Sequence, residues 1–120
     1  MKRAILLVDH GSRRAEANAV LDQMAALVQQ RRPDHLVRVA HLTQAQPSVA
    51  DAIEACVAAG AREIVVHPYF LVPGRHGAGD VPALVAAAAN RHPLVSIRVS
   101  PPLGAHAALV DAILARIEEA

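Results

Sequence analysis

Four short apolar runs recur along the chain at the spacing of strands in a parallel sheet. In the first run the apolar positions are continuous rather than alternating, which is typical of a strand covered on both faces. The runs predict strands over residues 3–9, 36–42, 63–67 and 94–99.

Helices are predicted between and after these runs, and in the first two of them apolar positions recur at three- and four-residue spacing. We expect helices over residues 13–31 and 48–59, a third from about Asp80 and a fourth over about 105–118. Ser48 and Asp80 are of the types that cap helix N-termini, and Pro82 suits a first turn. The predicted inner stripe of the first helix comprises Ala17, Val20, Leu21, Met24, Leu27 and Val28.

Strand and helix alternate four times, which predicts an α/β fold. Right-handed crossovers between the strands require a four-stranded parallel sheet with helices on both faces, in three layers. The 120 residues suffice for one domain, so we expect a single domain over residues 1–120. A sheet this small has two open edges and the helices are rich in alanine, which favours a homodimer.

Composition excludes several classes of function. The net charge of +1 and the absence of a basic block argue against a nucleic-acid partner. The single cysteine, Cys56, excludes an internal disulfide and a cysteine-cluster metal site, and its place on an apolar helix face predicts burial. No apolar run reaches the ~20 residues of a membrane span, and no signal-peptide pattern is present. We therefore expect a cytoplasmic protein without a membrane partner.

Two histidines stand near the ends of predicted strands. His10 follows the first strand and precedes Gly11-Ser12, and His76 lies in the long loop after the third strand. Parallel strands end at one edge of a sheet, where ligands bind. Two imidazoles there can hold a divalent metal or move protons near neutral pH. The residues alone leave open a structural role for each: a hydrogen bond at a strand end for His10, a surface loop for His76.

The other histidines divide into two groups. His41 and His67 end strands, and either face the same crevice or hydrogen-bond to backbone carbonyls. His35, in a turn, and His92, at a helix end, are expected to be structural. His106 is expected in the first turn of the last helix, on the surface or leaning over the crevice. Neither a Gly-x-Ser-x-Gly elbow nor a phosphate-binding glycine loop is present, which argues against a serine hydrolase and a nucleotide site.

The chain resembles the small sirohydrochlorin chelatases, the cobalto-, ferro- and nickel-chelatase relatives of tetrapyrrole biosynthesis. The resemblance runs in order along essentially the whole chain. Its most specific part is His-Gly-Ser at His10 followed by His-x-x-x-Asp-x-Pro at His76. The matching segments are Leu6-Leu7-Val8-Asp9-His10-Gly11-Ser12-Arg13, Gln46-Pro47-Ser48, Pro68-Tyr69-Phe70-Leu71, Gly74-Arg75-His76-Gly77-Ala78-Gly79-Asp80-Val81-Pro82 and Pro101-Pro102-Leu103-Gly104-Ala105-His106.

The resemblance implies a chelatase-like domain that inserts Co²⁺, Fe²⁺ or Ni²⁺ into sirohydrochlorin without ATP or an organic cofactor, in cobalamin or sirohaem biosynthesis. His10 and His76 would be the metal ligands and proton acceptors. Ser12, Arg13 and Arg75 would meet carboxylates of the macrocycle. Long family members carry two such domains in one chain, whereas short ones form the cleft as homodimers.

Two positions depart from the family pattern. Thr43 stands where many members carry an acidic residue, so the charge that would aid metal binding is missing. His41 is a speculative substitute for it. Asp9 replaces a small residue, and we expect it either to orient His10 or to serve as a substitute ligand. The loss at Thr43 keeps open a non-catalytic metal or tetrapyrrole carrier, or a scaffold that binds neither.

Overall fold

A parallel four-stranded sheet forms the centre of the computed structural model, which describes residues 2–72 and 80–120. The strand order is β2-β1-β3-β4, and every neighbouring pair is parallel, as predicted. The strands are β1 (Lys2–Asp9), β2 (His35–His41), β3 (Ala61–Pro68) and β4 (Ser96–Val99), and the helices are α1 (Ala15–Arg31), α2 (Val49–Ala58), α3 (Asp80–Arg91) and α4 (Leu109–Glu118).

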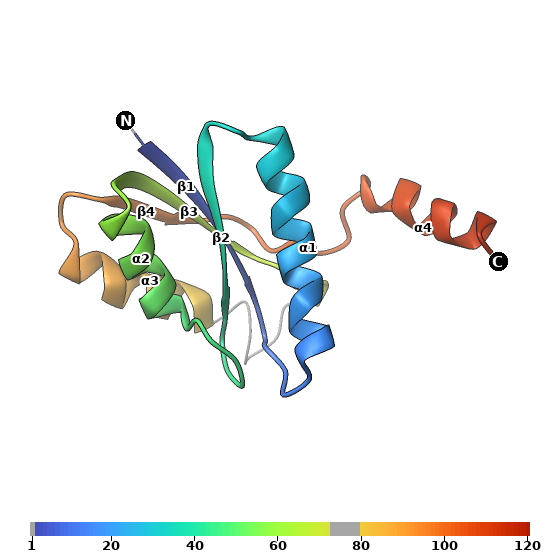
Figure 1. Cartoon of the computed structure of the whole chain (residues 1–120), viewed down its shortest axis with the longest axis horizontal. Helices are drawn as coiled ribbons and strands as arrows, with labels where there is room; N and C mark the ends of the chain where they lie inside the picture. The colour runs from blue at the N-terminus through green and yellow to red at the C-terminus, as the bar shows by residue number, and fades with distance from the viewer. Residues whose placement is uncertain (1, 73–79) are drawn as a thin grey trace.

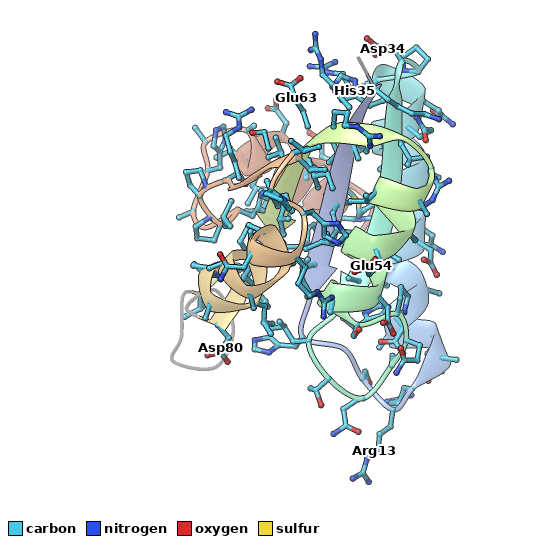
Figure 2. The ribbon with its side chains drawn as sticks, turned by 90° about the vertical axis from the view of Figure 1, so that its left-hand side faces the viewer. Arg13, Asp34, His35, Glu54, Glu63 and Asp80 are labelled. Carbon is cyan, nitrogen blue, oxygen red and sulfur yellow. The ribbon has the colours of Figure 1, made fainter. Side chains whose placement is uncertain are left out.

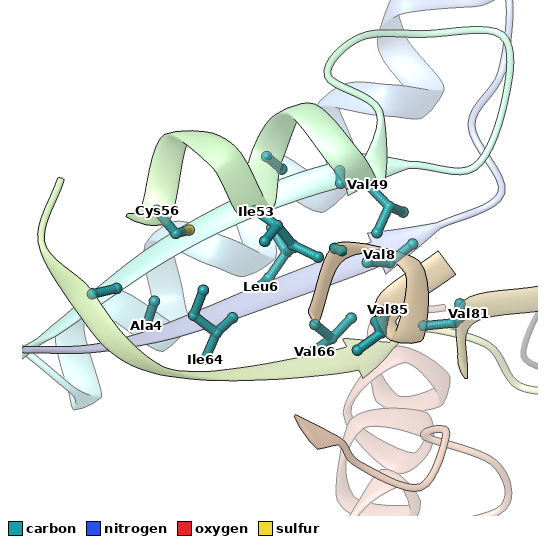
Figure 3. Close-up of a cluster of buried hydrophobic side chains, with 14 of the residues drawn as sticks. Ala4, Leu6, Val8, Val49, Ile53, Cys56, Ile64, Val66, Val81 and Val85 are labelled. Atoms are coloured by element: carbon teal, nitrogen blue, oxygen red, sulfur yellow. The ribbon is translucent and has the colours of Figure 1, made fainter. Parts of the chain in front are cut away.

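The larger core lies between the sheet and the pair α2 and α3. Alternate residues of a strand point to opposite faces, so Leu6 and Val8 of β1 face this pair of helices. They pack with Ile53 and Cys56 of α2 and with Val85 of α3, all of them buried (Figure 3). Burial raises the pKa of the Cys56 thiol, which fits the predicted role as an inert core residue.

The opposite face of the sheet carries α1 alone among the described helices (Figure 1). Leu21 and Ala25 of α1 pack on Leu7 and Val37. The predicted inner stripe is only partly confirmed, because Val20 is 48% exposed and a second member, Leu27, 53%. The spacing correctly marks these positions as apolar, but α1 is rotated so that one flank overlooks a part of the sheet that no described helix covers.

The last helix differs most from expectation. It begins at Leu109 rather than near residue 105, because the backbone turns at Gly104 (φ +58°) and His106 accepts a hydrogen bond from the Ala108 N–H just before the helix. No residue of α4 is buried, and the helix points away from the sheet (Figure 1). Of the four predicted helices, three therefore cover the sheet.

Candidate functional site

A hollow of about 410 Å³ lies at the carboxyl edge of the sheet, where the sequence predicts a ligand site. It is enclosed by the end of β1, the first turns of α1 and the chain after β3. Most of its wall is apolar, with a few polar groups at the β1 side. The lining residues are Asp9, His10, Gly11, Ser12, Ala17, Asn18, Val20, Leu21, Tyr69 and Phe70.

His10 joins this hollow, as predicted. Its side chain is exposed at the end of β1 and stands edge-on against Phe70, with ring centroids 4.6 Å apart and planes at 64°. The His10 carbonyl accepts a hydrogen bond from Thr43 N at 3.0 Å. The backbone of His10 is thus held from β2's side and its ring rests on Phe70, while the ring nitrogens remain accessible to a ligand.

Gly11 allows the turn that follows His10 to pack against the loop after β2. Its φ of +86° lies in the left-handed region, which favours glycine. A Cβ at this position would stand 1.8 Å from the Thr43 carbonyl oxygen, so a side chain cannot be added without moving backbone.

Asn18 stabilises the same turn and was missed by the sequence reasoning. Its Oδ1 accepts a hydrogen bond from Ser12 N at 2.9 Å, and its Nδ2 donates to the Ser12 carbonyl at 2.8 Å. The Ser12 Oγ accepts a third bond, from Arg14 N at 3.0 Å. An asparagine in the first turn of a helix, just after a turn, is the signal that could have found this role, since short polar side chains bond to nearby backbone.

Among the predicted binding residues, Arg13 is described by the structure, whereas Arg75 and His76 are not. Arg13 is exposed at the end of the molecule where the carboxyl edge of the sheet lies, and Figure 2 places Asp80 toward the same end. Its Nε donates to Gln44 Oε1 at 3.2 Å. Arg75 and His76 lie outside the described residues. In the sequence they fall between the hollow-lining Phe70 and Asp80 at the start of α3.

Asp9 contacts a different histidine from the expected one. Its Oδ1 lies 2.5 Å from Nδ1 of His41, which faces it across the β1–β2 pair. The expectation that Asp9 orients His10 is therefore wrong. His41 is only 3% exposed, and its backbone N–H donates to the Pro47 carbonyl. A buried imidazole paired with a carboxylate is satisfied where it stands, so the pair holds the ends of β1 and β2 together beneath the hollow.

His67, at the end of β3, is half-buried beside Ser100. The Ser100 hydroxyl donates to the Pro101 carbonyl at 3.0 Å, so its oxygen accepts from His67 Nδ1 at 2.8 Å. Burial lowers the pKa of His67, and backbone hydrogen bonding at Pro101 opposes part of that effect. His67 is thus held neutral by its surroundings.

The lowered pKa of His67 predicts a loss of stability in acid. The unfolded chain binds a proton at the ordinary histidine pKa of about 6.5, whereas the folded chain resists protonation until lower pH. The free energy of unfolding should therefore fall as pH drops through about 6.5. In urea titrations across this pH range, His67→Gln should flatten the fall, whereas His106→Gln, at an exposed position, should not. An equal slope for wild type and His67→Gln would contradict the assignment.

The remaining histidines make local contacts away from the hollow. His35 begins β2 instead of lying in the preceding turn, and its Nδ1 bonds to Asp34 at 3.0 Å (Figure 2). His92 Nε2 bonds to Glu54 at 2.9 Å and ties the end of α3 to α2. His106 precedes α4 and lines a separate hollow with Leu71, so it does not lean over the site.

Within residues 2–72 and 80–120, no group of three or more histidine, cysteine or acidic side chains is arranged to hold a metal ion. Among the same residues, no helix is both long and apolar enough to cross a membrane. His10 is therefore the accessible imidazole that the described part of the chain contributes to the hollow.

Comparison with known proteins gives consistent matches over the whole chain. The family model described as CbiX matches residues 4–120. The chloroplastic sirohydrochlorin ferrochelatase of Arabidopsis thaliana is 41% identical over 114 residues, which are 95% of this chain and 51% of that protein. The chain thus spans about half the length of this relative.

Two solved structures share the fold. The sirohydrochlorin chelatase SirB from Bacillus subtilis subspecies spizizenii, in complex with cobalt, superposes with a TM-score of 0.88 at 31% identity, covering 99% of this chain and 51% of that one. A cobalamin biosynthesis CbiX protein from Marinobacter aquaeolei VT8 superposes with a TM-score of 0.82 at 28% identity, covering 98% and 95%. The same domain therefore occurs both as about half of a longer chain and as a chain of this size.

Proposed function

Since this chain belongs to the CbiX family, we propose that it inserts a divalent metal ion into sirohydrochlorin, without ATP or an organic cofactor, in cobalamin or sirohaem biosynthesis. The observation that carries the proposal is the hollow at the carboxyl edge with the accessible imidazole of His10 at its rim. Relatives named sirohydrochlorin ferrochelatase and cobaltochelatase match over nearly all of this chain. Co²⁺, Fe²⁺ and Ni²⁺ all suit imidazole nitrogen, so each is a candidate substrate.

The proposed roles of the residues follow from what insertion requires. The metal must be held loosely enough to be released, which suits two neutral imidazoles, His10 and His76. The pyrrole N–H groups must lose their protons, which the same imidazoles can accept near neutral pH. Among the lining residues, the exposed Val20 and the partly buried Tyr69 offer an apolar surface for the flat macrocycle.

The carboxylates around the macrocycle need positive or hydrogen-bonding groups. Arg13 is exposed at the same edge, and its guanidinium suits one of these carboxylates. The Ser12 hydroxyl accepts from Arg14 N and keeps its own hydrogen for a ligand. We assign Arg75 the same role as Arg13 from its place in the family pattern.

We further infer that the working unit is a homodimer in the cytoplasm. The relative from Arabidopsis thaliana and the cobalt-bound SirB chain are each matched over about half their length, so two copies of this chain supply an equivalent amount of structure. In one copy the hollow is bounded by the end of β1, the first turns of α1 and the chain after β3. A second copy would close its open side. The net charge of +1 gives no reason to add a nucleic-acid partner.

A carrier that binds metal or tetrapyrrole without turnover is the second candidate, and Thr43 favours it. The Thr43 N–H bonds to the His10 carbonyl, so residue 43 adjoins the proposed ligand but offers no carboxylate. Asp9, the acidic residue that lines the hollow, is engaged with His41.

Turnover distinguishes the two candidates. Sirohydrochlorin and Co²⁺, Fe²⁺ or Ni²⁺ are mixed anaerobically with a small fraction of an equivalent of protein, and the absorbance change is corrected for spontaneous insertion. A chelatase will convert many equivalents at a rate that saturates with substrate. A change that stops at one equivalent, or no acceleration with any of the three metals, overturns the enzyme in favour of the carrier.

A further inference from the structure

Gln44 has an unusual backbone conformation at the edge of the site. Among the described residues it is the one non-glycine residue in the left-handed region, with φ of +68°. This region is unfavourable for a residue with a Cβ, and residues that are held there cluster at ligand-binding sites. The strain at Gln44 therefore points to a function for its side chain.

The loop after β2, which carries Gln44, is fixed to the turn after β1. Leu42 N donates to the Asp9 carbonyl at 3.0 Å. Thr43 N donates to the His10 carbonyl, also at 3.0 Å. Gln44 follows directly in the chain, so the place of its backbone beside this turn is set by backbone hydrogen bonds rather than by flexible side chains.

The side chain of Gln44 contacts Arg13 in that turn. Its Oε1 accepts a hydrogen bond from Arg13 Nε at 3.2 Å, although the two residues are 31 positions apart in the chain. A guanidinium carries five N–H groups in one plane, and this bond uses the one on Nε. The groups on Nη1 and Nη2 are left at the outer end, which extends away from the ribbon in Figure 2. These outer groups form the fork that binds both oxygens of a carboxylate.

The partner of Arg13 is neutral, unlike the partners of several other arginines. Arg14, the next residue, lies 2.8 Å from a carboxylate oxygen of Glu16, which balances its charge. Arg3 and Arg91 also contact glutamates. Within the part of the chain that the structure describes, Arg13 forms no ion pair. An amide can thus fix this guanidinium while its full positive charge stays available to an anion.

Arg13 lies where the edge of a bound macrocycle is expected. A tetrapyrrole holds its metal at the centre of the ring and carries its carboxylates at the periphery. His10, the proposed metal ligand, is three residues from Arg13, and a chain of that length spans at most about 10 Å. Arg13 follows Ser12, which lines the hollow, and is not itself a lining residue. The two side chains therefore suit the centre and the periphery of one ligand.

We propose that Gln44 is a positioning residue for the macrocycle. It holds the Arg13 guanidinium, without neutralising it, so that the outer N–H groups bind a peripheral carboxylate. This role rests on the proposed function and deepens it, because it names a residue that sets the affinity for the substrate. An arginine that is held in place before binding loses less conformational freedom when the ligand arrives.

Replacing Gln44 with glycine separates positioning from stability. Glycine adopts the left-handed conformation without strain, so Gln44→Gly should melt at the wild-type temperature or above it, measured by circular dichroism. The same variant should bind metal-free sirohydrochlorin about three- to tenfold more weakly, since the free arginine must be immobilised on binding. Affinity is measured by absorbance titration of sirohydrochlorin without metal. Wild-type affinity in this variant overturns the proposal, because a purely structural Gln44 would give that result.

Gln44→Glu tests the importance of a neutral partner. Glutamate has the same shape and still accepts from Arg13 Nε, but it balances the charge of the guanidinium. Binding of metal-free sirohydrochlorin should weaken about tenfold, as expected for the loss of a hydrogen bond to a charged group. Gln30→Glu, at an exposed position in the last turn of α1, changes the net charge equally and should bind as wild type does. Equal affinities of the two variants contradict the proposal.

A double variant shows whether Gln44 acts through Arg13. Arg13→Gln should remove the same contact, so adding Gln44→Gly to it should weaken binding little further. Fully additive losses overturn the assigned role.

Binding without metal also keeps this result separate from turnover. A protein that binds sirohydrochlorin and shows these losses, but inserts no metal, fails as a chelatase while the role of Gln44 stands. A wild type that does not bind sirohydrochlorin overturns both the role of Gln44 and the proposed function.

Discussion

Replacing His10 with alanine is expected to lower the catalysed insertion rate by about 100-fold or more, because the variant loses the proposed metal ligand and proton acceptor together. The side chain is exposed and its ring contacts Phe70 edge-on, so its removal leaves no buried polar group unpaired. The melting temperature should therefore change little. The rate is followed by anaerobic absorbance with Co²⁺, after subtraction of the spontaneous reaction.

A matched control separates this effect from the loss of any histidine. His35→Ala removes an imidazole at the amino edge of the sheet, at the opposite end of β2 from His41, and should keep the wild-type rate. His76→Ala is expected to behave as His10→Ala does. A His10→Ala protein that retains the rate within twofold would remove His10 from the proposed mechanism.

Gly11→Ala is expected to be the most destabilising single substitution at the site. The left-handed φ of +86° alone costs about 1–3 kcal/mol for a residue with a Cβ. The new methyl group must also displace the Thr43 carbonyl, which would stand 1.8 Å away. We expect a fall in melting temperature of about 10 °C or more, measured by circular dichroism.

Gly60→Ala is the control for the clash. Gly60 also has a left-handed backbone, with φ of +100°, but the nearest atom to an added Cβ is Lys2 Cδ at 3.7 Å, the ordinary distance of contact. This variant carries the conformational cost without the collision, so its melting temperature should fall clearly less. Equal losses in the two variants would show that the Thr43 contact contributes nothing.

Local pattern was sufficient for much of the fold and for part of the site. The apolar runs and the helical spacing predicted the order of strands and helices, because each depends on neighbouring residues only. His10 was found for the same reason: a polar residue directly after a buried strand lies at the ligand-binding edge of a parallel sheet. Cys56 and the Ser48 cap were also predicted correctly, and Ser48 Oγ accepts from Asp51 N at 3.1 Å.

The features that the sequence did not reveal depend on how separate segments meet. Asp9 bonds to His41 because the β1–β2 register places these two residues opposite each other, and no local pattern encodes that register. Val20 and Leu27 were assigned to the core because periodicity identifies apolar residues but not the surface that covers them. The same reason explains α4, which was predicted as a helix although local pattern does not show that none of its residues is buried in the described structure.

The short segment between β4 and α4 connects the last helix to the residue that supports His10. Gly104 N bonds to the carbonyl of Phe70 at 2.9 Å, and the ring of Phe70 supports the imidazole of His10. A displacement of the segment that leads into α4 would therefore reach the backbone of Phe70 through this hydrogen bond. The position of this segment and the support of the His10 imidazole are then mechanically coupled.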